Sequence, residues 1–212
     1  MTTTMIKPED VKRLREQTGA GVMDCKRALE ESGGDIEKAT HWLREKGLST
    51  AAKKAGRVAL EGVVTSYIHH GSRLGVLLEL NCETDFVART EDFHKLARDL
   101  AIAVAGHAPI YVSRDDVPGD VLEAQRRAFT LDAEQEDGPA DRVPVVVEGK
   151  LNKWLEAACL MELPYRDTDR KVSDLVTEKI ALLGENIRVA RFVRMAVGES
   201  GSAEAGSGPE AA

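Results

Sequence analysis

The sequence predicts an α+β protein, with a three-helix module at the amino terminus followed by a core of a small antiparallel sheet packed with helices. Three patterns predict this. Apolar residues recur at helical spacing in three short segments before Gly47, they alternate along 61–82 and 186–197, and long amphipathic segments lie between those two regions. Because strands and helices are segregated along the chain, we expect an antiparallel sheet with helices on one face.

The three amino-terminal helices are short and end near glycines. Pro8 suits a first helical position, and a second helix is expected over Val22–Glu31. Asp35 is a good N-cap for the third helix, which we expect to end before Gly47. Since helices of this length are marginally stable alone, they must pack together as a bundle.

The core is predicted from strand and helix patterns. Two β-rich runs, Glu61–His70 and Leu74–Cys82, flank a Gly71-Ser72-Arg73 turn and predict a hairpin, and Asn186–Val197 predicts a closing strand. The amphipathic segments predict helices over Thr90–Gly106, Asp120–Glu136, Arg142–Glu162 and Val172–Leu183.

These patterns divide the chain into four predicted regions. A helical module occupies residues 1–48, a short helical or extended linker 49–60, and the core 61–198. Residues 199–212 contain no core-forming side chain and are expected to be a disordered tail.

Charge and hydropathy exclude several classes of protein. The net charge is −7, made up of +2 over residues 1–56 and −9 over the rest, and an acidic body argues against direct nucleic-acid binding. No apolar run approaches the ~20 residues of a membrane span, and the first ten residues lack the apolar region of a secretory signal. We therefore expect a cytoplasmic protein that binds no membrane.

No motif for chemistry is visible. The sequence lacks G-x-x-x-x-G-K-[ST] and G-x-G-x-x-G, so no direct nucleotide binding is predicted. His69 and His70 are adjacent in a predicted strand and point to opposite faces, which disfavours a metal site. The widely spaced cysteines are expected to be buried and inert: Cys25, Cys82 and Cys159. The sequence predicts no enzyme and no cofactor.

Several longer segments carry a family resemblance. Thr18–Leu29 is TGAGVMDCKRAL, Asn81–Ala88 is NCETDFVA, and Leu183–Gly198 is LGENIRVARFVRMAVG. In this order they closely resemble the elongation factor Ts family. Two further matches, AAKKAGRVALEGVV from Ala51 and EGKLNKWLEAACLMELPYRD from Glu148, extend the resemblance from about Lys12 to Gly198.

The resemblance implies a function and its residues. Members of this family bind the GTPase elongation factor Tu and speed the release of its GDP, without covalent chemistry of their own. The resemblance implies that a ubiquitin-associated-like amino-terminal module docks on the partner's nucleotide domain, and that a second segment lies near the partner's nucleotide and magnesium. The implied docking residues are Arg15, Val22, Met23 and Lys26, and the implied segment is Thr84, Asp85, Phe86 and Val87, with Asp85 and Phe86 foremost.

The chain departs from the family pattern in two places. Leu163-Pro164-Tyr165 stands where the family usually has Q-P-F, which puts contacts there in question. The chain also has one core where longer members have a second core repeat and a helical hairpin. Short members pair two copies, so a homodimer is implied, and it would be non-covalent because the closing strand has no cysteine.

The same residues also allow structural interpretations. Phe86 could project at the rim of the sheet as a binding hot spot, or turn inward while Asp85 caps a helix. Met23 could face a partner or lie at the edge of the core, and Arg15 could be a solvated charge. The alternative function is an adaptor, in which a ubiquitin-associated-type module binds peptides and the second domain dimerises.

Overall fold

The fold is taken from a computed structural model of the 212-residue chain, which describes residues 6–135, 140–166, 168 and 170–199. The chain forms two compact units, each assembled from separate parts of the sequence. Unit 1 comprises Met1–Val63, Leu80–Leu96 and Asp174–Arg188; unit 2 comprises Val64–Glu79, Ala97–Ser173 and Val189–Ala212. The predicted division into 1–48, 49–60 and 61–198 stays a prediction, and the predicted tail lies outside the described residues from 200 onward.

The amino-terminal helices of unit 1 form the expected bundle. They are α1 (Pro8–Thr18), α2 (Val22–Glu31) and α3 (Ile36–Lys54). Pro8 occupies the first turn of α1, and the Asp35 side chain caps α3 by accepting from the N–H groups of Glu37 and Lys38. Their shared core consists of buried residues from all three helices: Leu14, Cys25, Ala28, Leu29 and Ala39.

Helix α3 is longer than the sequence suggested. It passes through Gly47 and ends at Lys54, so much of the segment expected as a linker is helical. Gly47 is buried, and a side chain there would touch Thr177 and Ala181 of helix α8. Packing within unit 1 therefore outweighs the weak helical propensity of glycine.

The three strands form one antiparallel sheet in the order β1-β2-β3, which confirms the α+β class. Strand β1 spans Glu61–Ile68, β2 Leu74–Cys82 and β3 Arg188–Ala196. The N–H of His69 donates to the carbonyl oxygen of Leu74 (2.8 Å), and that of Val197 donates to Arg73 (2.8 Å), which sets the register of both pairs. In β1, Gly62 has φ 151°, and a Cβ there would lie 2.1 Å from the carbonyl oxygen of Leu80, so only glycine fits.

Apart from the short α4, which was not predicted as a helix, the remaining helices lie within the predicted segments or one residue beyond them. The helices are α4 (Asp85–Ala88), α5 (Glu91–His107), α6 (Gly119–Gln135), α7 (Val143–Ala158) and α8 (Val172–Leu183), with 3₁₀ turns at Arg114–Asp116, Ala140–Arg142 and Leu160–Glu162. The apolar side chains on one face of α5 are fully buried: Phe93, Leu96, Leu100 and Val104.

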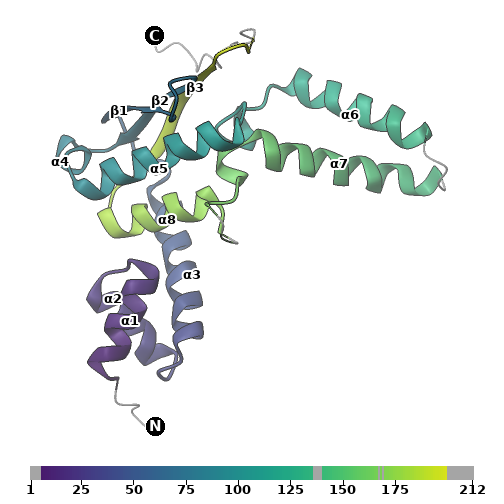
Figure 1. The fold of residues 1–212 in the computed structure, drawn as a ribbon. Coiled ribbons are helices and arrows are strands. Elements are labelled where there is room, and N and C mark those ends of the chain that lie inside the picture. The colour runs from purple at the N-terminus through teal and green to yellow at the C-terminus, as the bar shows by residue number, and fades with distance from the viewer. Residues whose placement is uncertain (1–5, 136–139, 167, 169, 200–212) are drawn as a thin grey trace. The chain divides into compact units, whose positions relative to one another are not determined.

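The predicted helix over Arg142–Glu162 is wrong at its end. Backbone at Cys159 is extended (φ −105°, ψ 123°), and this residue forms a parallel bridge with Tyr111. Helices α6 and α7 run antiparallel as a hairpin (Figure 1). In the described part of the chain, no helix is long and apolar enough to cross a membrane.

Candidate functional site

The predicted binding segment forms a tight turn directly after strand β2. Thr84 is the N-cap of α4, and its hydroxyl oxygen accepts from the N–H of Val87 at 3.3 Å. Phe86 is 78% exposed, whereas Val87 is 5% exposed and Ala88 is also buried. The turn therefore holds its apolar side inward and presents one aromatic ring to solvent.

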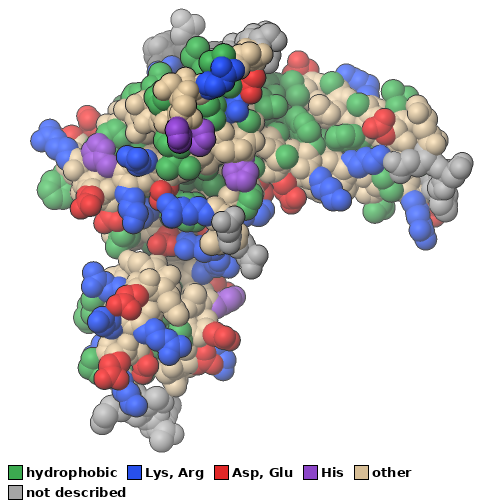
Figure 2. All heavy atoms as spheres, viewed as in Figure 1, with side chains coloured by type: hydrophobic (Ala, Val, Ile, Leu, Met, Phe, Trp, Pro, Cys, Tyr) green, Lys and Arg blue, Asp and Glu red, His purple; other side chains and the backbone are tan. Residues whose placement is uncertain are grey.

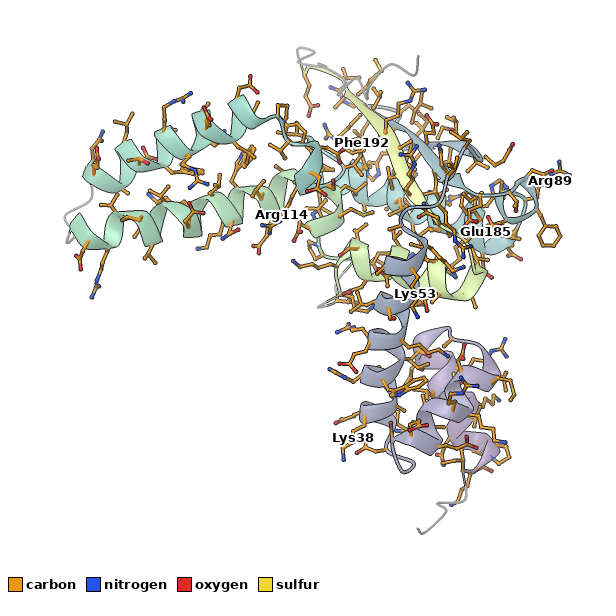
Figure 3. All side chains as sticks on the ribbon, turned by 180° about the vertical axis from the view of Figure 1, so that it is seen from behind. Lys38, Lys53, Arg89, Arg114, Glu185 and Phe192 are labelled. Atoms are coloured by element: carbon orange, nitrogen blue, oxygen red, sulfur yellow. The ribbon has the colours of Figure 1, made fainter. Side chains whose placement is uncertain are left out.

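Asp85 does not serve as the helix cap, because Thr84 does so. Its carboxylate instead pairs with the Arg89 guanidinium one helical turn later, at 2.7 Å, and both side chains are largely exposed. Figure 3 shows Arg89 at the outer side of the turn. An exposed pair of this kind contributes little to stability, so both charges remain available to a partner.

The turn is fixed from below by Glu185, which lies in the connection between α8 and β3 (Figure 3). One carboxylate oxygen of Glu185 accepts from the backbone N–H groups of Glu83 (3.0 Å) and Thr84 (3.1 Å). The other accepts from the Thr84 hydroxyl at 2.6 Å. Hydrogen bonds to a charged acceptor are stronger than neutral ones, so the start of α4 is held firmly.

Glu83 makes the reciprocal contact. Its carboxylate accepts from the backbone N–H of Asn186 at 2.6 Å, and this bond lowers the pKa of Glu83, with Arg57 nearby as a lesser cause. The buried Asn186 side chain donates to the carbonyl oxygens of Arg57 (2.7 Å) and Ala55 (3.4 Å). The loop 184–186 therefore joins the turn to the segment that follows α3.

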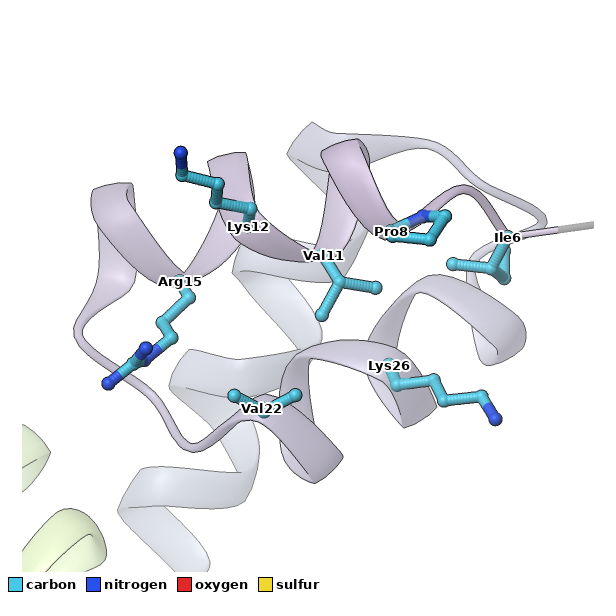
Figure 4. Close-up of a pocket in the computed structure, with 7 residues that line it drawn as sticks. All are labelled: Ile6, Pro8, Val11, Lys12, Arg15, Val22 and Lys26. Carbon is cyan, nitrogen blue, oxygen red and sulfur yellow. The ribbon is translucent and has the colours of Figure 1, made fainter.

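Three of the four predicted docking residues of the helical module line one groove. Arg15, Val22 and Lys26 line an open groove of about 420 Å³ between α1 and α2, together with apolar Ile6, Pro8 and Val11 (Figure 4). Val22 is half exposed. Positive side chains thus flank an apolar floor, a combination that suits a protein surface with apolar and acidic groups.

Met23 lies outside this groove and is 72% exposed. It therefore does not lie at the edge of the bundle core, and its contact with a partner stays a prediction. On the face of α1–α3 seen in Figure 2, basic and acidic side chains are intermixed. That mixture differs from the one-sign surface of a nucleic-acid-binding protein.

The family-pattern departure at Leu163-Pro164-Tyr165 has an internal role. Leu163 is buried, and the Tyr165 hydroxyl donates to the Asp99 carboxylate at 2.9 Å. Burial, with this bond, raises the pKa of Tyr165. Asp99 also pairs with Arg166 at 2.7 Å, so this segment is tied to α5 within unit 2.

The cysteines carry no reactive thiol. All three are fully buried, and burial raises the pKa of Cys25 and brings the pKa of both Cys82 and Cys159 to about 11. The Cys82 thiol donates to the carbonyl oxygen of Thr84 at 3.1 Å, beneath the turn. Among the described residues, no group of three His, Cys, Asp or Glu side chains is placed to hold a metal ion.

Sequence reasoning assigned no role to Glu83, Glu185 or Asn186. All three lie inside the NCETDFVA and LGENIR segments that carried the resemblance, but Glu83 is about a hundred residues from Glu185 and Asn186. Polar residues beside turn positions are common, so their local sequence does not reveal a pairing.

Comparison with known proteins gives a consistent result. Residues 35–199 match the family described as elongation factor TS. The chain is 56% identical over 196 residues to elongation factor Ts of Carboxydothermus hydrogenoformans, covering 92% of this chain and 90% of that protein. It is 55% identical to the Moorella thermoacetica protein of that name (92% and 97% covered) and 54% identical to the Thermotoga maritima protein (89% and 94%).

Proposed function

The chain belongs to the elongation factor Ts family of translation elongation factors, and on that premise we propose that it is a guanine-nucleotide exchange factor for elongation factor Tu. It promotes GDP release by binding this GTPase in the cytoplasm and disturbing its magnesium and phosphate site. It carries out no covalent chemistry and needs no cofactor of its own.

The observation that carries this proposal is the exposed ring of Phe86 on a fixed turn. A large apolar side chain 78% exposed makes few contacts within its own fold. Aromatic residues presented from a rigid support are typical hot spots of protein interfaces, worth about 2 kcal/mol or more on truncation. Asp85 and Arg89 flank the ring with charges that can orient the partner.

The groove of the helical module supplies the second contact. Arg15, Val22 and Lys26 line this groove. Met23 follows Val22 in the sequence, lies outside the groove and is largely exposed. Flexible methionine suits an adaptable anchoring contact. Thr84 and Val87 act differently: Thr84 caps the turn and Val87 packs inside it, so both support Phe86 from within this protein.

Nucleotide exchange requires the groove contact and the Phe86 contact to affect the partner's affinity for GDP differently. Nucleotide and exchange factor weaken each other's binding to the partner by the same factor, because the coupling is reciprocal. The groove anchors the partner, while Phe86 wedges partner helices apart and favours a nucleotide-poor conformation. Anchoring alone would raise affinity and leave GDP release unchanged.

Release of a fluorescent GDP from purified elongation factor Tu, with and without this protein, tests the proposal. We expect a large acceleration that Phe86→Ala reduces. The adaptor alternative predicts no acceleration, and that result would overturn the exchange function.

We also propose that two copies associate through the outer face of the sheet. In the register given by His69 and Val197, exposed side chains of the three strands fall into rows on this face. The face is mainly apolar: Val64, Ile68, Leu77, Val193 and Met195 are exposed on it, and Glu79 pairs there with Arg191 at 2.8 Å. An apolar patch of this kind marks an interaction surface, and a second copy would cover it symmetrically.

A further inference from the structure

We propose that Glu185 is a positioning residue for nucleotide exchange, whose carboxylate holds the α4 turn so that Phe86 is presented in one orientation. The inference rests on the proposed function, because it concerns how the exchange contact is made. Glu185 itself need not touch the partner.

Both carboxylate oxygens of Glu185 accept hydrogen bonds from the start of the α4 turn. One oxygen accepts from two successive backbone N–H groups, those of Glu83 and Thr84, at 3.0 and 3.1 Å. The other accepts from the Thr84 hydroxyl at 2.6 Å, and that hydroxyl oxygen accepts in turn from the N–H of Val87 at 3.3 Å. Each bond in such a chain polarises the next, so the carboxylate acts on the first turn of α4 through Thr84.

Without the Glu185 carboxylate, few contacts would restrain the α4 turn. Residues 83–86 lie at the surface, and Thr84, Asp85 and Phe86 are all exposed. Packing alone restrains only the inward side chains Val87 and Ala88. Because a loose segment must be ordered when it binds, a turn freed from Glu185 would lose part of the binding free energy of Phe86 to that ordering.

Glu185 lies in loop 184–186, which bonds both the end of α3 and the α4 turn. Its neighbour Asn186 donates its backbone N–H to Glu83 (2.6 Å) and its side-chain amide to the carbonyl oxygen of Arg57 (2.7 Å), while Lys54 at the end of α3 donates to the Gly184 carbonyl. One loop therefore bonds both the end of the helix that completes the docking bundle and the turn that carries Phe86. Motion of either element is resisted through the same few residues.

A carboxylate with a purely structural role would give a different result from a positioning residue. If Glu185 acts by way of Phe86, its removal should have no further effect once the Phe86 ring is gone. If it merely stabilises unit 1, its removal should slow exchange equally in both backgrounds.

The test measures stimulated release of fluorescent GDP from elongation factor Tu by full-length variants. We expect Glu185→Ala to slow release about tenfold, equivalent to about 1.4 kcal/mol. Glu185→Gln keeps an oxygen for the two N–H groups and should recover most of that rate. Glu185→Asp keeps the charge but shortens the reach, so it should also be slow, and the test does not depend on the alanine variant alone.

The matched control is Asp92→Ala. Asp92 is also a carboxylate of unit 1, and it pairs with Lys179 at 2.6 Å; within the described part of the chain it forms no hydrogen bond or ion pair with residues 83–87. We expect its exchange rate to stay within about twofold of the unmodified protein, as for an ordinary surface substitution. Hydrogen exchange at the amides of Glu83 and Thr84 should rise in Glu185→Ala and stay unchanged in the control.

The outcomes separate the two levels of the proposal. Slow release by Glu185→Ala, with no added effect in the Phe86→Ala background, supports the positioning role. A slow Phe86→Ala with a normal Glu185→Ala, or an additive loss in the double variant, overturns the positioning role alone. A normal rate for Phe86→Ala overturns the proposed function of that ring, and the positioning role with it.

Discussion

Replacing Phe86 with alanine should separate activity from stability, because the ring lies outside the fold it is attached to. Its side chain is 78% exposed, so folding removes only about a fifth of its surface from water. Full burial of such a side chain is worth about 1.5–3 kcal/mol, so Phe86→Ala should change the free energy of unfolding by about 0.5 kcal/mol. As an interface hot spot the same ring is worth about 2 kcal/mol or more, which corresponds to about a 30-fold slower stimulated GDP release.

Phe93 provides the matched control within unit 1. It lies on α5 with no exposed surface, so Phe93→Leu should lower the free energy of unfolding by about 1–2 kcal/mol, as core truncations do. Its exchange rate per folded molecule should stay close to that of the unmodified protein. Urea unfolding followed by circular dichroism and stopped-flow GDP release measure the two quantities.

We expect Phe86→Ala to lose exchange activity and keep its stability, and Phe93→Leu to do the reverse. A Phe86→Ala variant that lost as much stability as Phe93→Leu would show that the ring packs within the fold. A variant that kept full stability and full exchange activity would show that the exposed ring is not a contact with elongation factor Tu.

Four further predictions concern single groups. Thr84→Val should lower the unfolding free energy by about 1 kcal/mol through loss of the α4 cap, and Thr84→Ser should not; equal urea curves for both would refute the cap. The bond from Asn186 lowers the pKa of Glu83, so its stabilising effect is present at neutral pH and is lost as the pH falls through that lowered pKa. Glu83→Gln should therefore flatten the acid side of the stability profile, and an unchanged profile would contradict the assignment. Cys82, with a pKa of about 11 and no exposed surface, should resist iodoacetamide at pH 8, where about 0.1% is thiolate, until the protein unfolds. Leu77→Asp should shift sedimentation toward the monomer, and an unchanged dimer would exclude the sheet face as its interface.

The parts of the fold that the sequence predicted well have strong local signals. Strand β2 and helix α8 begin and end where predicted, because the hydrophobic period is regular and the boundaries carry turn residues. Pattern reasoning failed where distant packing decides the backbone. Gly47 continues α3 because α8 covers it, and the helix after Val143 ends at Ala158 because Cys159 bridges to Tyr111.

The candidate site divides in the same way. The local sequence left two orientations of Phe86 open, and in the structure the ring is exposed. The burial of Val87 follows from one helical turn, which places residues 85 and 86 outward and 87 and 88 inward. The contact between Glu185 and Thr84 could not be predicted, since no local rule relates residues 101 apart.

In the proposed mechanism, reciprocal coupling gives a physical reason why the two proposed contacts are built differently. A contact made equally well in the GDP-bound and nucleotide-poor partner raises affinity for both and shifts no population. We propose that the helical module behaves in that way, because the long side chains of Arg15 and Lys26 in the groove, and of the exposed Met23 outside it, can adapt to either conformation. In this proposal Phe86 discriminates between the two conformations of the partner. It can do so only if the turn that carries it is more rigid than the partner helices that it separates. The hydrogen bonds from Glu185 would supply this rigidity at the α4 turn, which carries Phe86.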